Sequence, residues 1–206
     1  MGNESSNPIR NMDKRTARRE YRESFTKAIE DFQLENNANP DAHPQTEEEM
    51  LAEHAERDLK FDGVDGSGKQ NNVRVVVRKR PIFKHEQDGH EFDVVSCLEG
   101  RTAVIHDTRM HADMRRMLIT NNAFAFDGVF HERATNEMVY QSAAKPLVKE
   151  AVHGGFATVC VYGQTGSGKS FTMTSIYEKA AHEIFRELDS NNDRMYAMPR
   201  ISMSFF

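Results

Sequence analysis

The chain has 206 residues, 27 of them Lys or Arg and 32 Asp or Glu, so its formal net charge is −5. No apolar run approaches the roughly 20 residues of a membrane-spanning helix. The acidic balance argues against a nucleic-acid polymer as partner, because its phosphates attract basic proteins. Only two cysteines, Cys97 and Cys160, and no apolar leader at the amino terminus favour a reducing, cytosolic compartment over a disulfide-stapled secreted module.

The first 72 residues differ from the rest of the chain. They carry a net charge of −6 and only 19 apolar residues, whereas residues 73–206 carry +1. So few apolar side chains do not offset the entropy of folding, and we predict an acidic, largely disordered arm over residues 1–72. The Gly-rich stretch 63–72 reads as a flexible connector. Residues 73–206 are enough to build one core.

One part of this arm has helical spacing. Its apolar residues predict an amphipathic helix over about residues 14–34, followed by an acidic linker over 35–60. A partner helix or a neighbouring domain docked on the apolar stripe is one interpretation, and a marginal helix surrounded by solvent is the other. The stripe consists of Tyr21, Phe25, Ala28, Ile29 and Phe32.

Two segments read as strands and one as a helix. Val73–Pro81 begins with β-branched residues and ends at a proline, which predicts a strand. Arg78 and Arg80 are two residues apart, so they project to the same side of this strand. Residues 136–152 predict a helix that Thr135 caps and that Gly154-Gly155 ends. Ala157–Tyr162 is a short apolar run typical of a buried parallel strand.

The segment after this run carries the chemistry. Gly163–Ser170 matches G-x-x-x-x-G-K-[ST] in full, and the next 18 residues have the apolar spacing of a helix. Glycines let the backbone approach phosphate oxygens, and the N–H groups at the start of a helix bind anions. Lys169 supplies a positive charge for the β- and γ-phosphates, and the Ser170 hydroxyl is a ligand for Mg²⁺. The similar stretch Asp65–Lys69 lacks a preceding strand and reads as linker.

Several motifs in this order resemble the amino-terminal part of a kinesin motor domain, over about residues 73–206. Within that superfamily the sequence is most similar to the kinesin-13 group of microtubule depolymerases. The motifs are V-R-V-V-V-R-K-R-P (73–81), I-H-D (105–107), D-M-R-R-M-L (113–118), F-A-F-D-G-V-F (124–130), N-E-M-V-Y (136–140), K-P-L-V (145–148) and G-Q-T-G-S-G-K-S-F-T-M (163–173).

The resemblance implies an α/β fold, the three-layer sandwich of P-loop NTPases, truncated after the fourth core strand. It also implies ATP and Mg²⁺ as cofactors, tubulin and microtubules as partners, and a place in the cytoplasm on the microtubule cytoskeleton, including the spindle. Arg78, Arg80 and Pro81 would border the adenine, and Phe171 stands where kinesins usually carry a His that packs on the base. The residues expected to wrap the phosphates are Gly163, Gln164, Thr165, Gly166, Ser167, Gly168, Lys169 and Ser170.

The sequence departs from the family pattern at three places. Thr172-Met173 runs almost directly into Ser175–Tyr177, so a surface loop common in kinesins looks absent. The Lys-Val-Asp finger by which kinesin-13 members press on tubulin is matched by His111-Ala112-Asp113, which replaces a permanent cation by an imidazole. The segments that sense the γ-phosphate would follow the apolar stretch 200–206.

These departures bear on activity. Hydrolysis needs groups that position water and stabilise developing charge, and the resemblance places those groups beyond residue 206. We therefore expect nucleotide binding without catalytic residues in this chain, and negligible turnover by the chain alone. The first alternative is a non-catalytic kinesin-like module that binds tubulin or another partner. The second, an unrelated small P-loop kinase, would need acidic Mg²⁺ ligands and Arg clamps after the fourth strand.

Overall fold

The computed structural model describes residues 14–36, 38, 73–98, 100–111, 116–190 and 202. The chain divides into two compact units. The first combines residues 1–46 with 61–133, and the second combines 47–60 with 134–206. Each unit has its own cluster of buried apolar side chains.

A pair of parallel strands forms part of the first unit. Strand β1 (Val76–Arg78) pairs with β5 (Gly128–Phe130), with Val77 opposite Val129. The strand predicted over Val73–Pro81 is thus confirmed in a shorter form. Its β-branched residues favour the extended backbone that the pairing needs.

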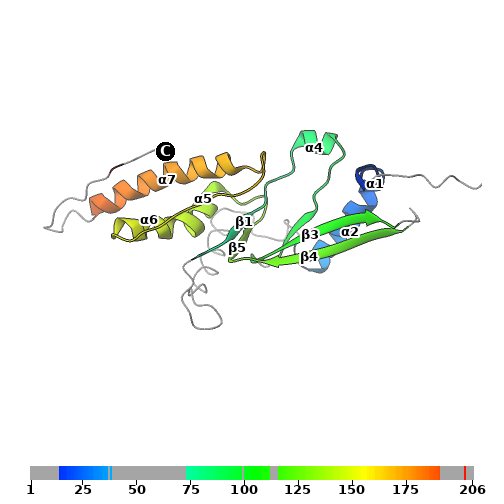
Figure 1. Cartoon of the computed structure of the whole chain (residues 1–206), viewed down its shortest axis with the longest axis horizontal. Coiled ribbons are helices and arrows are strands. Elements are labelled where there is room, and N and C mark those ends of the chain that lie inside the picture. Colours follow the sequence, from blue (N-terminus) through cyan, green and yellow to red (C-terminus); the bar gives the residue numbers. More distant parts are fainter. Residues whose placement is uncertain are drawn as a thin grey trace, which may run out of the picture. The chain divides into compact units, whose positions relative to one another are not determined.

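An antiparallel sheet of three strands forms the other strand structure among the described residues of this unit. After the short helix α4 (Lys84–Asp88), β2 (Val95–Leu98) pairs with β3 (Thr102–Met110), which pairs with β4 (Met117–Ala125). Figure 1 shows β3 and β4 as one long hairpin. Because side chains alternate between the faces of a strand, β3 buries one set of them. The buried set on one face is Val104, His106 and Thr108.

The amphipathic stretch of the arm forms two helices where one was predicted. Helix α1 (Lys14–Glu20) and helix α2 (Arg22–Glu35) meet at Tyr21. The apolar stripe is not left in solvent, because α2 buries Phe25 and Ile29 in the first unit. The cluster they form with Phe92 also contacts Tyr21, Val94, Met110 and Ile119.

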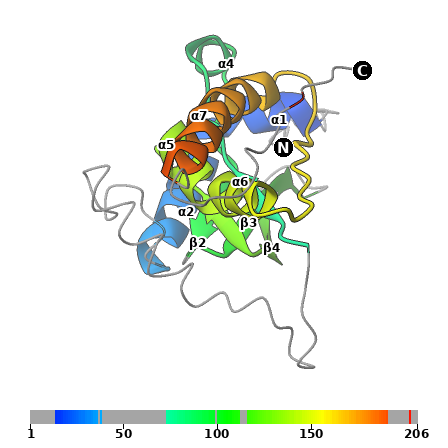
Figure 2. The same ribbon diagram turned by 90° about the vertical axis from the view of Figure 1, so that its left-hand side faces the viewer.

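The second unit is helical in its described part. Helix α5 (Asn136–Val139) continues as the π-helix η2 (Tyr140–Ala144) and then as α6 (Lys145–Val152). The long helix α7 (Lys169–Ser190) contacts α5, η2 and α6 (Figure 1 and Figure 2). The buried side chains at this contact are Tyr140, Ala144 and Ile176.

The predicted cap of this helical stretch is confirmed. The Thr135 hydroxyl accepts a hydrogen bond from the Met138 N–H at 3.3 Å. At the other end, Gly154 has a φ of +93° and its N–H donates to Ala151. The five π-helical residues directly precede the turn that contains Pro146, which has no N–H to donate within the helix.

The strand predicted over Ala157–Tyr162 is not formed, so this prediction is wrong. The segment has no assigned strand structure, and the side chains of Phe156 and Tyr162 are fully exposed. Cys160 is exposed as well. A buried strand needs neighbouring strands to pair its N–H and C=O groups, and no strand of the described residues pairs with this segment.

The mixture of helices and strands confirms the α/β class. The boundary predicted between residues 72 and 73 stays a prediction, because residues 39–72 lie outside the described part of the chain. The apolar stretch 200–206 also lies outside it, apart from Ser202. Among the helices that the structure describes, none has the length and apolar character to cross a membrane.

Candidate functional site

The loop Gly163–Ser170 leads directly into the amino terminus of α7, which begins at Lys169. Gly163 has a φ of +158°, and the two further glycines of the loop have left-handed φ angles, +80° at Gly166 and +93° at Gly168. A Cβ atom at either position would meet no atom within 4 Å, so the backbone conformation, and not crowding, calls for glycine there. The loop therefore turns as the G-x-x-x-x-G-K-[ST] pattern requires.

The Lys169 ammonium group is held by the loop itself. Its Nζ donates to the carbonyl oxygens of Gly163 and Gln164, both at 2.8 Å. An ammonium group has three N–H donors, so these two bonds leave one for an incoming acceptor. The side chain folds back over the loop, which places a positive charge at the helix end where the macrodipole is also positive.

Ser170 and Phe171 lie in the first turn of α7. Both are exposed, and the phenyl ring of Phe171 has an exposed fraction of 65%. In this turn the Thr172 N–H donates to the Gly168 carbonyl at 3.1 Å. The Ser170 side chain is thus accessible at the amino-terminal end of α7.

The predicted adenine-side residues lie at the end of β1, in the first unit. The Arg80 guanidinium forms a two-bonded ion pair with Glu86, at 2.5 and 2.8 Å, and lies 4.5 Å from the centre of the Phe83 ring. The bond from Arg80 lowers the pKa of Glu86 to about 2, and the same bond raises the pKa of Arg80. Burial lowers the pKa of Arg78. Arg80 is therefore already neutralised by a carboxylate.

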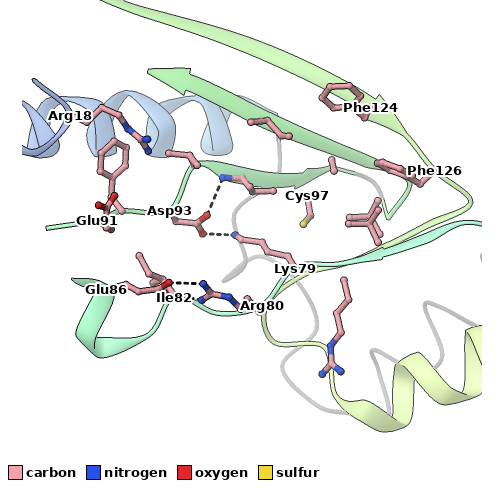
Figure 3. Close-up of a pocket in the computed structure, with 18 residues that line it drawn as sticks. Arg18, Lys79, Arg80, Ile82, Glu86, Glu91, Asp93, Cys97, Phe124 and Phe126 are labelled. Atoms are coloured by element: carbon pink, nitrogen blue, oxygen red, sulfur yellow. Dashed lines mark hydrogen bonds and ion pairs between the residues drawn. The ribbon is translucent and has the colours of Figure 1, made fainter. Parts of the chain in front are cut away.

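A cavity of about 730 Å³ lies beside these residues, entirely within the first unit (Figure 3). Arg78, Lys79 and Arg80 line it together with apolar side chains of β1 to β5. Figure 3 shows Lys79 reaching Asp93 and Arg80 reaching Glu86. The volume and the mostly apolar lining are those of a small-molecule site.

Lys79 is the centre of a charged cluster that the sequence did not reveal. Its Nζ lies 2.5 Å from Asp93 Oδ2 and 2.9 Å from Glu132 Oε2, and its side chain is only 8% exposed. Burial alone would lower the pKa of Lys79, but the two carboxylates outweigh it and raise that pKa. Burial alone would raise the pKa of Glu132, but the Lys79 charge outweighs it and lowers that pKa. The raised pKa of Lys79 and the lowered pKa of Glu132 keep both of these groups charged at neutral pH.

The predicted tubulin contacts are described only at their first residue. His111 follows β3, and its N–H donates to the Arg116 carbonyl at 2.9 Å, which closes the hairpin. Ala112 and Asp113 lie outside the described residues. The structure thus brings the eight loop residues and Phe171 together in the second unit, and places Arg78, Arg80, Pro81 and His111 in the first.

Comparison with known proteins identifies the family. Residues 78–206, more than half of the chain, match the kinesin motor domain. This match begins at the basic end of β1 and includes the loop Gly163–Ser170. The chain belongs to the kinesin motor domain family.

Two relatives show how far the likeness extends. The chain is 35% identical over 136 residues to the human "Kinesin-like protein KIF24". The aligned segment makes up 63% of this chain and 10% of that protein. It is 36% identical over 137 residues to "Diatom spindle kinesin-1" of Cylindrotheca fusiformis, covering 66% of this chain and 21% of the relative. The chain thus spans about a tenth and a fifth of the lengths of these relatives.

Proposed function

We propose that this chain is the ATP-binding part of a kinesin-like microtubule motor. The observation that supports this most directly is the loop Gly163–Ser170, with two left-handed glycines and the Lys169 ammonium at the end of α7. In the proposed complex the loop N–H groups and Lys169 bind the β- and γ-phosphates. Ser170 contributes a hydroxyl ligand to the Mg²⁺ that bridges them.

The proposed adenine contacts follow from the state of the arginines. Because Glu86 occupies the hydrogen-bonding fork of Arg80, this guanidinium offers the base a flat surface and little free charge for a phosphate. Arg78 and Pro81 complete this side in the proposal. The exposed ring of Phe171 stacks on the base without the hydrogen-bonding edge that a His would supply.

The share of the reaction that we assign to this chain is binding. Hydrolysis of the γ-phosphate requires a positioned water and further charge stabilisation, and we assign no catalytic residue among those described. The microtubule-stimulated ATPase activity is thus proposed for the motor as a whole. We propose that this ATPase activity drives either movement along microtubules or disassembly of microtubule ends.

We propose the kinesin-13 group as the subfamily. Support comes from the segments Asn136–Tyr140 and Lys145–Val148, which have the sequence expected of that group. His111, Ala112 and Asp113 are the proposed tubulin contacts at the end of the β3–β4 hairpin. The name of the diatom relative agrees with a place on spindle microtubules, which we propose along with the cytoplasm as the location of this chain.

Calorimetric titration of the folded chain with ATP and Mg²⁺ tests this function. Lys169→Ala removes a charged hydrogen bond, worth about 1.5–3 kcal/mol, and is expected to weaken binding roughly 10- to 100-fold. Lys149→Ala is the matched control, because this lysine lies on α6 with only a 3.9 Å contact to Glu187. A folded chain that takes up no Mg²⁺-nucleotide would contradict the proposal. If Lys169→Ala abolishes nucleotide uptake but leaves the cellular function of the protein intact, the non-catalytic binding module becomes the better description.

A further inference from the structure

The arm helices and the three-stranded sheet share one apolar contact. Phe25 on α2 is fully buried, and its ring stacks on Phe92, with 6.2 Å between ring centres and 6° between planes. Ile29, one turn further along α2, is 3% exposed in the same cluster. A fully buried Phe is among the largest contributions that one side chain makes to a contact. The arm is therefore packed on the sheet through its predicted apolar stripe.

A chain of hydrogen bonds continues this contact across the sheet. Gln33 Nε2 on α2 donates to Ser96 Oγ on β2 at 2.9 Å. Ser96 Oγ lies 2.8 Å from His106 Nε2 on β3, and His106 Nδ1 lies 2.8 Å from Asn121 Oδ1 on β4. If the Asn121 oxygen accepts from Nδ1, Nε2 is left to accept the Ser96 hydroxyl proton, so every group in the row has a partner. The row joins α2 to all three strands.

Charged and aromatic side chains extend the contact at both ends of the arm. Arg18 on α1 lies 5.4 Å from the Phe92 ring centre, and Arg19 lies 3.6 Å from Glu91. Near the end of α2, the Phe32 ring meets the edge of His106, with 5.0 Å between ring centres. The contact thus runs along the arm from Arg18 to Gln33. Its partners include residues that precede β2 in the sequence and residues that follow it.

The sheet needs this cover at one end more than at the other. Strand β2 pairs with β3 only from Thr102 to Ile105, whereas β3 and β4 pair as far as Met110 and Met117. Beyond His106 the hairpin is therefore two strands wide, and an isolated pair of strands is marginally stable in water. In this outer half, Met110 and Ile119 pack against the cluster of Phe25 and Ile29. The arm supplies there the packing that a third strand supplies in the inner half.

We propose that the arm helices α1 and α2 are the docking partner of the β2–β3–β4 sheet and hold the outer half of its hairpin in place. The outer half ends at His111 and Arg116, so the docked arm sets the position of the hairpin end. The consequence for tubulin rests on the proposed function, because it assigns tubulin contact to this end. The arm is a positioning element in this scheme.

Hydrogen exchange on the full chain tests the positioning role directly. Phe25→Asp places a carboxylate in the apolar contact and is expected to undock α2. Amide exchange should then quicken at least about tenfold in residues 106–110 and 117–121, while residues 102–105 and 122–125 change much less. Leu34→Ala is the matched control, since this apolar residue of α2 is 61% exposed. Gln33→Ala removes only the hydrogen bond from α2 to Ser96, and should give the same pattern of faster exchange at smaller size.

Each result decides the proposal. Unchanged exchange in the outer half for both Phe25→Asp and Gln33→Ala would overturn it, because the arm would then hold nothing. Equal acceleration in both halves for Gln33→Ala would also overturn it, since the arm would support the unit as a whole. Pelleting of the same variants with microtubules separates the two proposals. A wild-type chain that does not bind microtubules contradicts the proposed tubulin contacts at the hairpin end, whereas the exchange pattern still decides the role of the arm.

Discussion

The loop Gly163–Ser170 and the arm–sheet contact are both held by a few polar bonds, but over very different distances in the sequence. Lys169 bonds to carbonyls five and six residues away, whereas Gln33 bonds to Ser96 across 63 residues. The first arrangement is contained in one short motif. The second arises only when a helix and a sheet meet. Hydrogen bonds within a short motif can therefore be inferred from the spacing of its residues, whereas those between distant segments require the structure.

The largest effect is expected at a distant contact, the cluster around Lys79. Lys79→Ala leaves the carboxylates of Asp93 and Glu132 close together without their shared cation. Removing one partner of a buried ion pair costs about 3–5 kcal/mol, so the urea midpoint should fall markedly. Lys84→Ala, at an exposed position on α4, is the control and should change little. A loss no greater than that of the control would show that the cluster contributes nothing to stability.

The pH dependence of the unfolding free energy below neutral pH tests the same cluster through the ion pair of Lys79 and Glu132. The folded pKa of Glu132 is lowered from its usual 4.5, so its ion pair contributes in full above pH 4.5. That contribution is lost as the pH falls through the lowered pKa of the folded state. Glu132→Gln cannot titrate, and its unfolding free energy should therefore fall less steeply between pH 5 and pH 3 than that of the wild type. Parallel urea melts at these pH values measure the difference.

Gly168 offers a smaller, local test. Gly168→Ala forces a side chain into a backbone with a φ of +93°, which costs about 1–2 kcal/mol and should weaken Mg²⁺-ATP binding by roughly 5- to 30-fold. Lys149→Ala, on α6 and outside the loop, is the control. Equal affinities for both variants would mean that the loop adopts another conformation when it binds nucleotide.

The sequence was sufficient for features whose partners lie a few residues apart. It predicted the glycine loop, the start of the following helix, the Thr135 cap and the apolar stripe of α2. It did not reveal that the stripe meets Phe92, nor that Lys79 lies between Asp93 and Glu132, because neither pairing leaves a periodic signal. Nor did it predict the conformation of Ala157–Tyr162. The apolar composition of this segment suits a buried strand, but a strand forms only where neighbouring strands are available for pairing.

The smallest expected effect is at the Thr135 cap, where the interaction is entirely local. Thr135→Ala removes the oxygen that accepts the Met138 N–H and should lower the unfolding free energy by about 1 kcal/mol. Thr135→Ser keeps that oxygen and should be nearly neutral. The bond is long, at 3.3 Å, and the helix turns into a π-helix at Tyr140, so the loss is expected to stay within the start of the helix. Amide exchange at Met138 and Val139 should quicken in the Ala variant, while that of α7 stays unchanged. Faster amide exchange along α7 in the Ala variant would show instead that the cap stabilises the contact between α5 and α7. The hydrogen bond of Thr135 would then support a contact between residues far apart in the sequence.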